Sequence, residues 1–150
     1  MRIGIAADHG GFTLKTEIII QLRNEGHEIE DFGAFQLDPA DDYPDFVIPL
    51  ARAIAAQKVE RGIAICGSGV GACIAANKIP TIRAGLIHDS FSAHQGVEDD
   101  DMNMLCLGAR ICGPSLAAEL IRIYLAANFS GAARHQRRLA KLRALEAKPG

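Results

Sequence analysis

The stretch GIAICGSGVGA, residues 62–72, decides the fold class of this chain. Residues 62–66 form a short apolar run, which is typical of a strand buried on both faces. Three glycines follow within five residues, and the segment from Ala72 onward then predicts a helix. A strand that passes through a glycine-rich turn into a helix is typical of a parallel α/β sheet.

The same alternation of short apolar runs and amphipathic segments continues on both sides of this stretch. Strands are predicted at 2–7, 28–32, 62–66, 82–87 and 104–107. Helices are predicted around 14–22 and over 46–56, 72–78, 90–97 and 115–127, with Gly26 ending the first and Pro114 beginning the last. We therefore expect an α/β fold with a five-stranded parallel sheet and helices on both faces.

Length and composition predict one globular α/β domain over residues 1–130, followed by a basic segment over 131–150. The chain has 150 residues, of which 49% are hydrophobic and 23% charged, with a formal net charge of -2. This charge gives no reason to expect nucleic acid or a membrane surface as a partner. No segment approaches the roughly 18 apolar residues of a membrane span.

The four cysteines indicate a reducing compartment. They form no CxxC pair and show no zinc-like spacing with histidine, which favours reduced thiols in the cytoplasm. Cys73, Cys106 and Cys112 lie in apolar runs, so we expect them to be small buried side chains.

Polar side chains gather where the predicted strands end. Asp8 and His9 follow the first strand, Cys66 ends the third, and Arg110 follows the fifth. Ligands bind outside the carboxyl ends of the strands in an open parallel sheet. The sequence therefore predicts a binding site at this edge.

Cys66 and the glycine loop that follows it are suited to anionic chemistry. Successive glycines allow backbone amides to point into one concavity, where a helix N-terminus adds positive potential. Such a loop can hold a phosphate or a developing enolate oxygen. A thiol at a helix N-terminus is more readily deprotonated, so Cys66 is a candidate nucleophile or general base. An inert buried thiol is the alternative.

The basic segment over residues 131–150 places Arg134 and Arg138 four residues apart, on one helical face. Two guanidinium groups in this arrangement can hold a phosphate. Leucines at 139, 142 and 145 have helical spacing, so a solvated face or a subunit contact is the alternative.

Further motifs lie along the whole chain. They are Asp8-His9 with Gly11-Phe12 and Lys15, Asp42-Tyr43-Pro44, Cys66 to Gly71, Ile74 to Lys78, Ile82-Arg83-Ala84, Asn103, Gly108-Ala109-Arg110 and Arg134-His135-Gln136. By these motifs the chain resembles ribose-5-phosphate isomerase B, in the group that also holds galactose-6-phosphate isomerase subunits. The resemblance runs from Ile3 to about Arg138.

The resemblance implies a three-layer Rossmann-like sandwich and an aldose–ketose isomerase of a phosphorylated sugar, most readily ribose 5-phosphate. Cys66 would move a proton between C1 and C2 through an enediolate, and Ser68 would assist proton transfer between the sugar oxygens. The enediolate would be held by the backbone amides of residues 67–71, which include Gly67, Gly69, Val70 and Gly71. Asp8 and Tyr43 would contact the sugar.

The resemblance also implies a homodimer, with a tetramer as a further option, and a site built from both subunits without cofactor or metal. His9, Arg134 and Arg138 would hold the phosphate together with Arg110 from the partner subunit. The C-terminal helix would pack on the dimer.

Three positions matter for the comparison with the family, and two of them, Asp99 and Asp100, depart from its pattern. Some members carry a glutamate base after the glycine loop, where this chain has Ala72, which leaves Cys66 as the base. The family's ring-opening histidine and its neighbouring asparagine fall on Asp99 and Asp100. An ionised aspartate cannot donate a proton, although Asp99 could act as a base, and Asp100 could accept a proton from a sugar hydroxyl. An open-chain substrate such as a four-carbon sugar phosphate is therefore an alternative.

Three other functions fit parts of the sequence. Residues 67–72 match the dinucleotide pattern G-x-G-x-x-G/A, with Asp89 about 20 residues further on. The motif follows the third strand rather than the first, and the chain has no second domain. A non-catalytic sugar-phosphate-binding protein would explain Asp99 and Asp100. Nucleic-acid binding by the basic tail lacks interleaved aromatic residues.

Overall fold

Five parallel strands form the central sheet of the computed structural model, which describes residues 1–147. The strands are β1 (Arg2–Ala7), β2 (Glu28–Asp31), β3 (Arg61–Cys66), β4 (Ala84–Leu86) and β5 (Met104–Gly108). Their order across the sheet is β2-β1-β3-β5-β4. The predicted five-stranded parallel sheet is confirmed.

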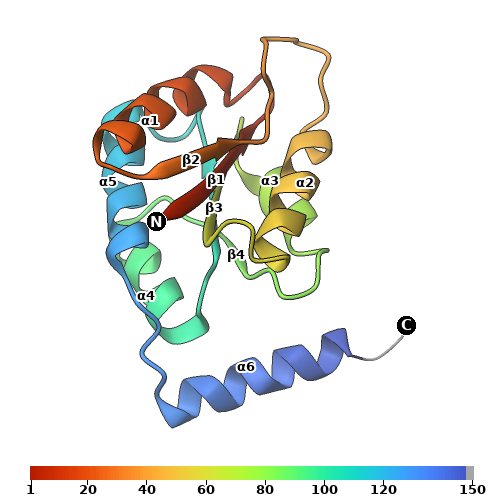
Figure 1. Ribbon diagram of the computed structural model, residues 1–150, viewed down its shortest axis with the longest axis vertical. Helices are drawn as coiled ribbons and strands as arrows, with labels where there is room; N and C mark the ends of the chain where they lie inside the picture. The colour runs from red at the N-terminus through yellow and green to blue at the C-terminus, as the bar shows by residue number, and fades with distance from the viewer. Residues whose placement is uncertain (148–150) are drawn as a thin grey trace.

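Helices cover both faces of this sheet, which gives three layers (Figure 1). On one face lie α1 (Phe12–Asn24), α4 (Ser90–Asp100) and α5 (Pro114–Ala126), and on the other lie α2 (Pro44–Ala55) and α3 (Val70–Ala76). The sixth helix, α6 (Ala133–Glu146), extends along one end of the domain and packs mainly on α4. Residues 148–150 of the predicted C-terminal segment lie outside the described residues.

The two faces of the sheet differ in side-chain size. The face toward α1, α4 and α5 carries large aliphatic side chains from alternate positions, such as Ile5, Ile63 and Leu107. The opposite face carries small ones, because alternate residues of a strand point to opposite sides. A methyl group at Gly4 would collide with Leu50 of α2, and one at Gly62 would collide with Ile54. These glycines therefore let α2 lie close to the sheet.

Element boundaries depart from the predictions in two places that matter for the site. Strand β4 begins at Ala84 rather than 82, because the Arg83 N–H donates to the side chain of Asn103 at 2.8 Å. Helix α4 continues to Asp100 rather than ending at 97. Asp99 and Asp100 therefore stand on the last turn of a helix.

The structure also bears on the predicted absence of a membrane span and on the burial of the cysteines. Within residues 1–147, no helix combines the length and the apolar composition needed to cross a membrane. Cys106 and Cys112 are buried as predicted, whereas Cys73 is only partly buried.

Candidate active site

The central strands β1 and β3 create the crevice in which the site lies. The chain leaves β1 through α1 on one face of the sheet and enters β3 from α2 on the other, so the strand order switches direction between them. Ligand sites of open α/β sheets lie at such switch points. A cavity of about 410 Å³ is present there, lined by Asp8, His9, Gly10, Tyr43, Cys66, Gly67, Ser68, Gly71, Arg110 and Ile111.

Cys66 ends β3 and is 5% exposed, at the base of this cavity. The Gly69 N–H donates to its Sγ at 3.1 Å, and the Val70 N–H donates to Ser68 Oγ at 3.3 Å. Gly69 has a φ of 80°, in the left-handed region that favours glycine, and begins α3. The loop thus turns tightly around the thiol and leaves the exposed Ser68 beside the opening.

Tyr43 forms one wall of the cavity by lying against Gly71. A Cβ atom at position 71 would stand 2.7 Å from Tyr43 Cζ. The glycine is therefore needed here for close approach of the ring, in addition to any role of its amide. Tyr43 is also the residue that precedes α2, so the position of this helix sets the position of the phenol.

Arg110 enters the cavity from the turn after β5. The Ala109 N–H donates to the Cys66 carbonyl at 2.9 Å, and the Arg110 N–H donates to the Gly67 carbonyl at 3.0 Å. These bonds join the β5–α5 turn to the glycine loop of the same chain, and the Arg110 side chain packs over Gly67. Neighbouring strands of one chain thus bring Arg110 beside Cys66 of the same chain, whereas the resemblance implied an Arg110 from the partner subunit.

Asp8 fixes the turn between β1 and α1. Its Oδ1 accepts the Gly10 N–H at 2.9 Å and the Gly11 N–H at 3.2 Å, and the residue is 7% exposed. A Cβ atom at Gly11 would collide with the Ile65 backbone, so the turn lies directly against β3. This packing brings Asp8 and His9 to the cavity that holds Cys66.

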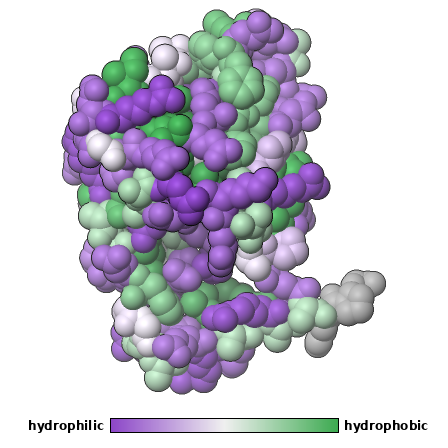
Figure 2. Space-filling model, viewed as in Figure 1, coloured by the Kyte–Doolittle hydropathy of each residue, from purple (hydrophilic) through white to green (hydrophobic). Residues whose placement is uncertain are grey.

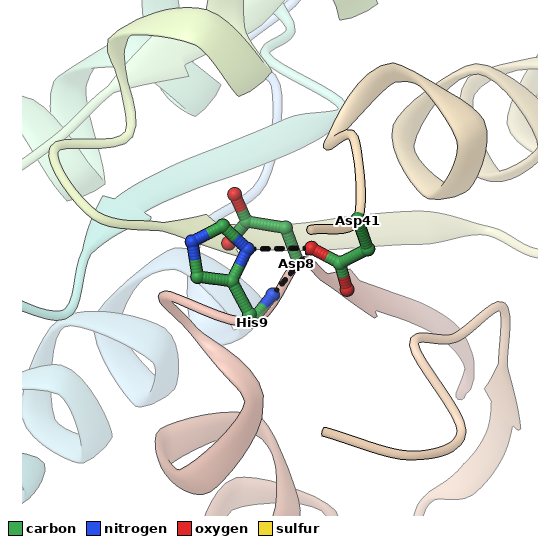
Figure 3. Close-up of side chains that lie close together, drawn as sticks. All are labelled: Asp8, His9 and Asp41. Carbon is green, nitrogen blue, oxygen red and sulfur yellow. Dashed lines mark hydrogen bonds and ion pairs between the residues drawn. The ribbon is translucent and has the colours of Figure 1, made fainter. Parts of the chain in front are cut away.

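His9 is paired with Asp41, a residue that the sequence analysis did not select. His9 Nδ1 lies 2.6 Å from Asp41 Oδ1, and the same oxygen accepts the His9 backbone N–H at 2.9 Å (Figure 3). The hydrogen bond to Asp41 raises the pKa of His9 above its ordinary value, and the charge of Asp8 adds to the rise. Arg110 and burial oppose it.

Asp8, His9 and Asp41 also cluster closely enough to suggest metal ligands, with one ligand atom from each within 4.8 Å of the others. The pair distance of 2.6 Å between His9 Nδ1 and Asp41 Oδ1 is that of a hydrogen bond. Two ligands of a tetrahedral zinc ion, each about 2.1 Å from the metal, lie roughly 3.4 Å apart. The geometry is therefore that of an imidazole–carboxylate pair.

The other predicted site residues lie elsewhere. Asp99, Asp100, Arg134 and Arg138 stand on α4 and α6, and none of them lines the Cys66 cavity of its own chain. Asp99 Oδ2 accepts from Gln95 Nε2 at 2.7 Å, and Asp99 Oδ1 lies 3.3 Å from His135 Nε2. We refer to the surface formed by α4 and α6 as the α4–α6 face.

The α4–α6 face is exposed and partly apolar. Arg134 and Arg138 are exposed on one side of α6, while His135 and Leu139 are buried beneath them. Between α6 and the body of the domain lies a groove of about 520 Å³, which Figure 2 shows as a hollow with hydrophobic residues beside it. Leu142, Leu145 and Asp100 line it.

Several motif residues do not line the cavity but form hydrogen bonds that connect elements of the fold. The buried Lys15 donates to Asp31 at 2.6 Å and to the Ala34 carbonyl at 2.7 Å, which ties α1 to the end of β2. Asn77 bonds the backbone of Ala84 through both its amide nitrogen and its oxygen. Asp89, the acid of the dinucleotide pattern, is the N-cap of α4 and accepts the Ser92 N–H at 2.7 Å, which lowers the pKa of its carboxyl.

A family model described as Ribose/Galactose Isomerase matches residues 3–142. The chain belongs to this family. A ribose-5-phosphate isomerase B from Clostridium thermocellum is 43% identical, with a TM-score of 0.94 and 97% of each chain covered. A Mycoplasma genitalium ribose-5-phosphate isomerase B with bound ribulose 5-phosphate is 38% identical, with a TM-score of 0.93 over 99% of this chain and 97% of that one.

A further relative has a different name. A D-erythrulose-4-phosphate isomerase from Pectobacterium atrosepticum is 40% identical over 134 residues, which cover 87% of this chain and 86% of that protein. The chain is thus a sugar-phosphate aldose–ketose isomerase with the three-layer fold that the resemblance predicted. The dinucleotide-binding and nucleic-acid-binding alternatives are set aside.

Proposed function

We propose that the protein interconverts ribose 5-phosphate and ribulose 5-phosphate, with Cys66 as the base that moves the proton between C1 and C2. One observation carries the proposal. A single cavity combines the Cys66 thiol, a carboxylate from Asp8, and two groups that attract a phosphate, His9 and Arg110. Most of the relatives named above as isomerases act on this pair of sugars by name.

The proposed reaction is balanced within the substrate. The Cys66 thiolate removes the proton from C2 of the aldose, and the C1 carbonyl oxygen takes up the negative charge of the enediolate. Ser68 transfers a proton from the C2 hydroxyl to the C1 oxygen, and Cys66 returns its proton to C1. Amides of the loop over residues 67–71 stabilise the charged oxygen. No electron leaves the sugar, so no external oxidant or reductant takes part.

We further propose that the protein is a homodimer in which the α4–α6 face of one subunit completes the cavity of the other. In this arrangement Arg134 and Arg138 reach the phosphate held by His9 and Arg110 across the interface. Exposed apolar side chains at Val70, Ile74, Leu86 and Phe91 support such a contact beside the glycine loop. In this proposal His9 and Arg110 come from one subunit and Arg134 and Arg138 from the other, whereas the resemblance implied that Arg110 comes from the partner.

A four-carbon sugar phosphate is the second candidate substrate. Asp99 is held by Gln95 and His135, and neither Asp99 nor Asp100 offers a hydrogen-bond donor when ionised. A tetrose phosphorylated at C4 has no free hydroxyl that can close a furanose ring, so its isomerisation needs no ring opening. The tetrose-phosphate relative supports this alternative.

The experiment is a panel of phosphorylated sugars with purified enzyme in D₂O. Ribose 5-phosphate, erythrulose 4-phosphate and galactose 6-phosphate are incubated separately, and NMR follows both product formation and deuterium uptake at C1 and C2. Turnover of ribose 5-phosphate supports the first proposal, and exclusive turnover of the tetrose supports the second. If no sugar phosphate is turned over while the protein still binds one, the chain is a sugar-phosphate-binding protein instead.

We also place the protein in the cytoplasm. All four cysteines are free thiols, including the partly exposed Cys73, and such thiols persist in a reducing compartment. Fractionation of cells expressing the natural chain, with cytoplasmic and periplasmic markers, tests this placement.

A further inference from the structure

Asp41 is presented to the active site by a fixed turn. In Asp38-Pro39-Ala40-Asp41, the Asp41 N–H donates to the Asp38 carbonyl at 3.1 Å, and the Ala40 N–H donates to Asp38 Oδ1 at 2.9 Å. Aspartate at the first position and proline at the second are the residues that favour such a turn. The turn therefore holds Asp41 in place before any ligand arrives.

The carboxylate of Asp41 controls both the backbone and the ring of His9, 32 residues earlier in the chain. Its Oδ1 accepts the His9 N–H at 2.9 Å and lies 2.6 Å from Nδ1. The Asp41 side chain is only 8% exposed, whereas that of His9 is 35% exposed and lines the cavity. Nε2 lies on the side of the ring away from Asp41, as Figure 3 shows.

We propose that Asp41 is a positioning residue that keeps His9 cationic and turns its Nε2–H toward the cavity, where His9 binds the phosphate of the substrate. This inference rests on the proposed function. It makes the strength with which His9 binds the phosphate depend on Asp41, which does not itself contact the substrate. An imidazolium with one N–H held by a carboxylate presents its second N–H in a fixed direction.

A second observation supports a cationic partner for Asp41. Its Oδ2 is buried and has no hydrogen-bond partner within residues 1–147. A buried carboxylate with one unsatisfied oxygen is costly unless an opposite charge lies close by. The His9 ring is the group that Asp41 Oδ1 contacts, so a protonated ring compensates the carboxylate.

Three charged groups from separate segments face His9. Asp8 at the end of β1 and Asp41 in the turn raise its pKa, and Arg110 from the β5–α5 turn lowers it. A raised pKa keeps the ring protonated to a higher pH, and the cation is lost as pH rises through that value. Removal of the Asp41 charge leaves Arg110 opposed only by Asp8, so the ring should lose its proton at a lower pH.

The first test reads the His9 ring directly by NMR in protein without substrate. Asp41→Asn keeps an oxygen that can accept the His9 N–H but removes the charge, and Asp45→Asn removes one exposed negative charge nearby as the matched control. We expect the His9 titration midpoint to fall in Asp41→Asn and to stay unchanged in Asp45→Asn. An unchanged midpoint in Asp41→Asn overturns the proposal. If Asp41→Asn does not fold, Asp41→Ser replaces it.

The second test measures binding of inorganic phosphate across pH, and the KM of any sugar phosphate that is turned over. A fall of one unit in the His9 pKa changes the fraction of protonated His9 by up to about tenfold, so phosphate binding should weaken by up to that factor as pH rises through the two midpoints. The defect should vanish below both midpoints, where the ring is protonated in both proteins, and should grow toward its maximum as pH rises through them, with kcat near that of the wild type. A loss equal at every pH indicates a structural role and contradicts the proposal.

A His9→Gln background provides a further control. In that background Asp41→Asn should add no pH-dependent weakening, because the ring through which it acts is gone. The NMR and phosphate measurements need no turnover, so they remain decisive even if the proposed isomerase reaction fails. If no sugar phosphate is turned over but Asp41→Asn still lowers the His9 titration midpoint, the proposed reaction is rejected and the proposed role of Asp41 stands.

Discussion

The Cys66 cavity and the α4–α6 face differ in how completely a single chain builds them. In the cavity, the turn after β1, the end of β3, the turn after β5 and the loop before α2 are joined by hydrogen bonds and close packing. On the α4–α6 face, the arginines are exposed and the carboxylate of Asp99 lies against Gln95 of α4 and His135 of α6. The chemistry of one region can be inferred from one chain, whereas the role proposed for the other depends on the proposed dimer.

The largest effect is expected from Cys66→Ala, which removes the proposed base from the cavity. General-base removal lowers rates by about 10²- to 10⁴-fold, and Ala72 provides no carboxylate as a substitute. Steady-state kinetics on the preferred substrate measures the loss. Cys112→Ala is the matched control, because it removes another buried thiol on the opposite face of the sheet. Near-normal rates in Cys66→Ala would show that the thiol is not the base.

The next effect tests the α4–α6 face. Arg134→Ala combined with Arg138→Ala should raise KM by about 10- to 100-fold, because two charge-assisted contacts to the phosphate are lost. Arg137→Ala with Arg143→Ala removes the same charge from α6 and serves as the control. A change in kcat alone would contradict a binding role.

Mixing two defective variants, assayed at a substrate concentration well below the KM of the arginine variant, makes this comparison sharper. Subunits carrying Cys66→Ala and subunits carrying the Arg134 and Arg138 replacements are unfolded together and refolded. In a random mixture half of the dimers are mixed, and each has one intact site if the arginines act across the interface, so about a quarter of wild-type activity returns. No recovery would place both sets of residues in the same subunit.

A smaller and selective effect is expected at Asp99. If Asp99 acts as a base during ring opening, Asp99→Ala should lower kcat/KM for ribose 5-phosphate by about tenfold and leave a tetrose phosphate unaffected. Kinetics with both sugars measure the ratio. Glu98→Ala, the preceding position, is the control. An equal loss on both substrates would point to disturbed packing against His135 instead.

The smallest effect on activity is expected at Cys73, although its thiol is reactive. A hydrogen bond with Cys106 lowers the pKa of Cys73 to about 7, while the pKa of Cys106 is raised by that bond and by burial. In a Cys66→Ala background, iodoacetamide should therefore modify Cys73 before Cys106 or Cys112, with a rate that rises through pH 7. Mass spectrometry identifies the modified thiol.

Cys73→Ser should leave the isomerase rate within about twofold of wild type, since surface and partly buried substitutions away from a site have small effects. This result would separate the reactive thiol on α3 from the proposed base. A loss comparable to that of Cys66→Ala would show that the catalytic role had been assigned to the wrong cysteine.

Sequence patterns predicted the sheet and most of the cavity because both depend on local signals. The alternation of apolar runs and glycine turns located the strands, and the strand-end rule brought Asp8, His9 and Cys66 together correctly. The place of Arg110 beside Cys66 of its own chain was not predicted, because motif resemblance carries no information about which chain supplies a residue. The backbone bonds between the β5–α5 turn and the glycine loop are what hold Arg110 there.

Asp41 was not predicted as a site residue because its partner lies far away in the sequence. The turn before it has a clear signal in Asp38 and Pro39, but its pairing with His9 spans 32 residues and depends on the placement of two loops. The length of α4 was also underestimated, because Asp99 and Asp100 are poor helix formers whose position is fixed by packing against α6.

The two glycines inside the sheet have a consequence for mutational tolerance. Gly4 and Gly62 set how closely α2 approaches, and α2 carries Tyr43 at its beginning. A methyl group added at position 62 would collide with the Ile54 side chain of α2, so either that side chain or the helix must shift. Two residues that line no part of the Cys66 cavity thus help to set where one of its walls stands, and a substitution there can be felt in the site without touching it.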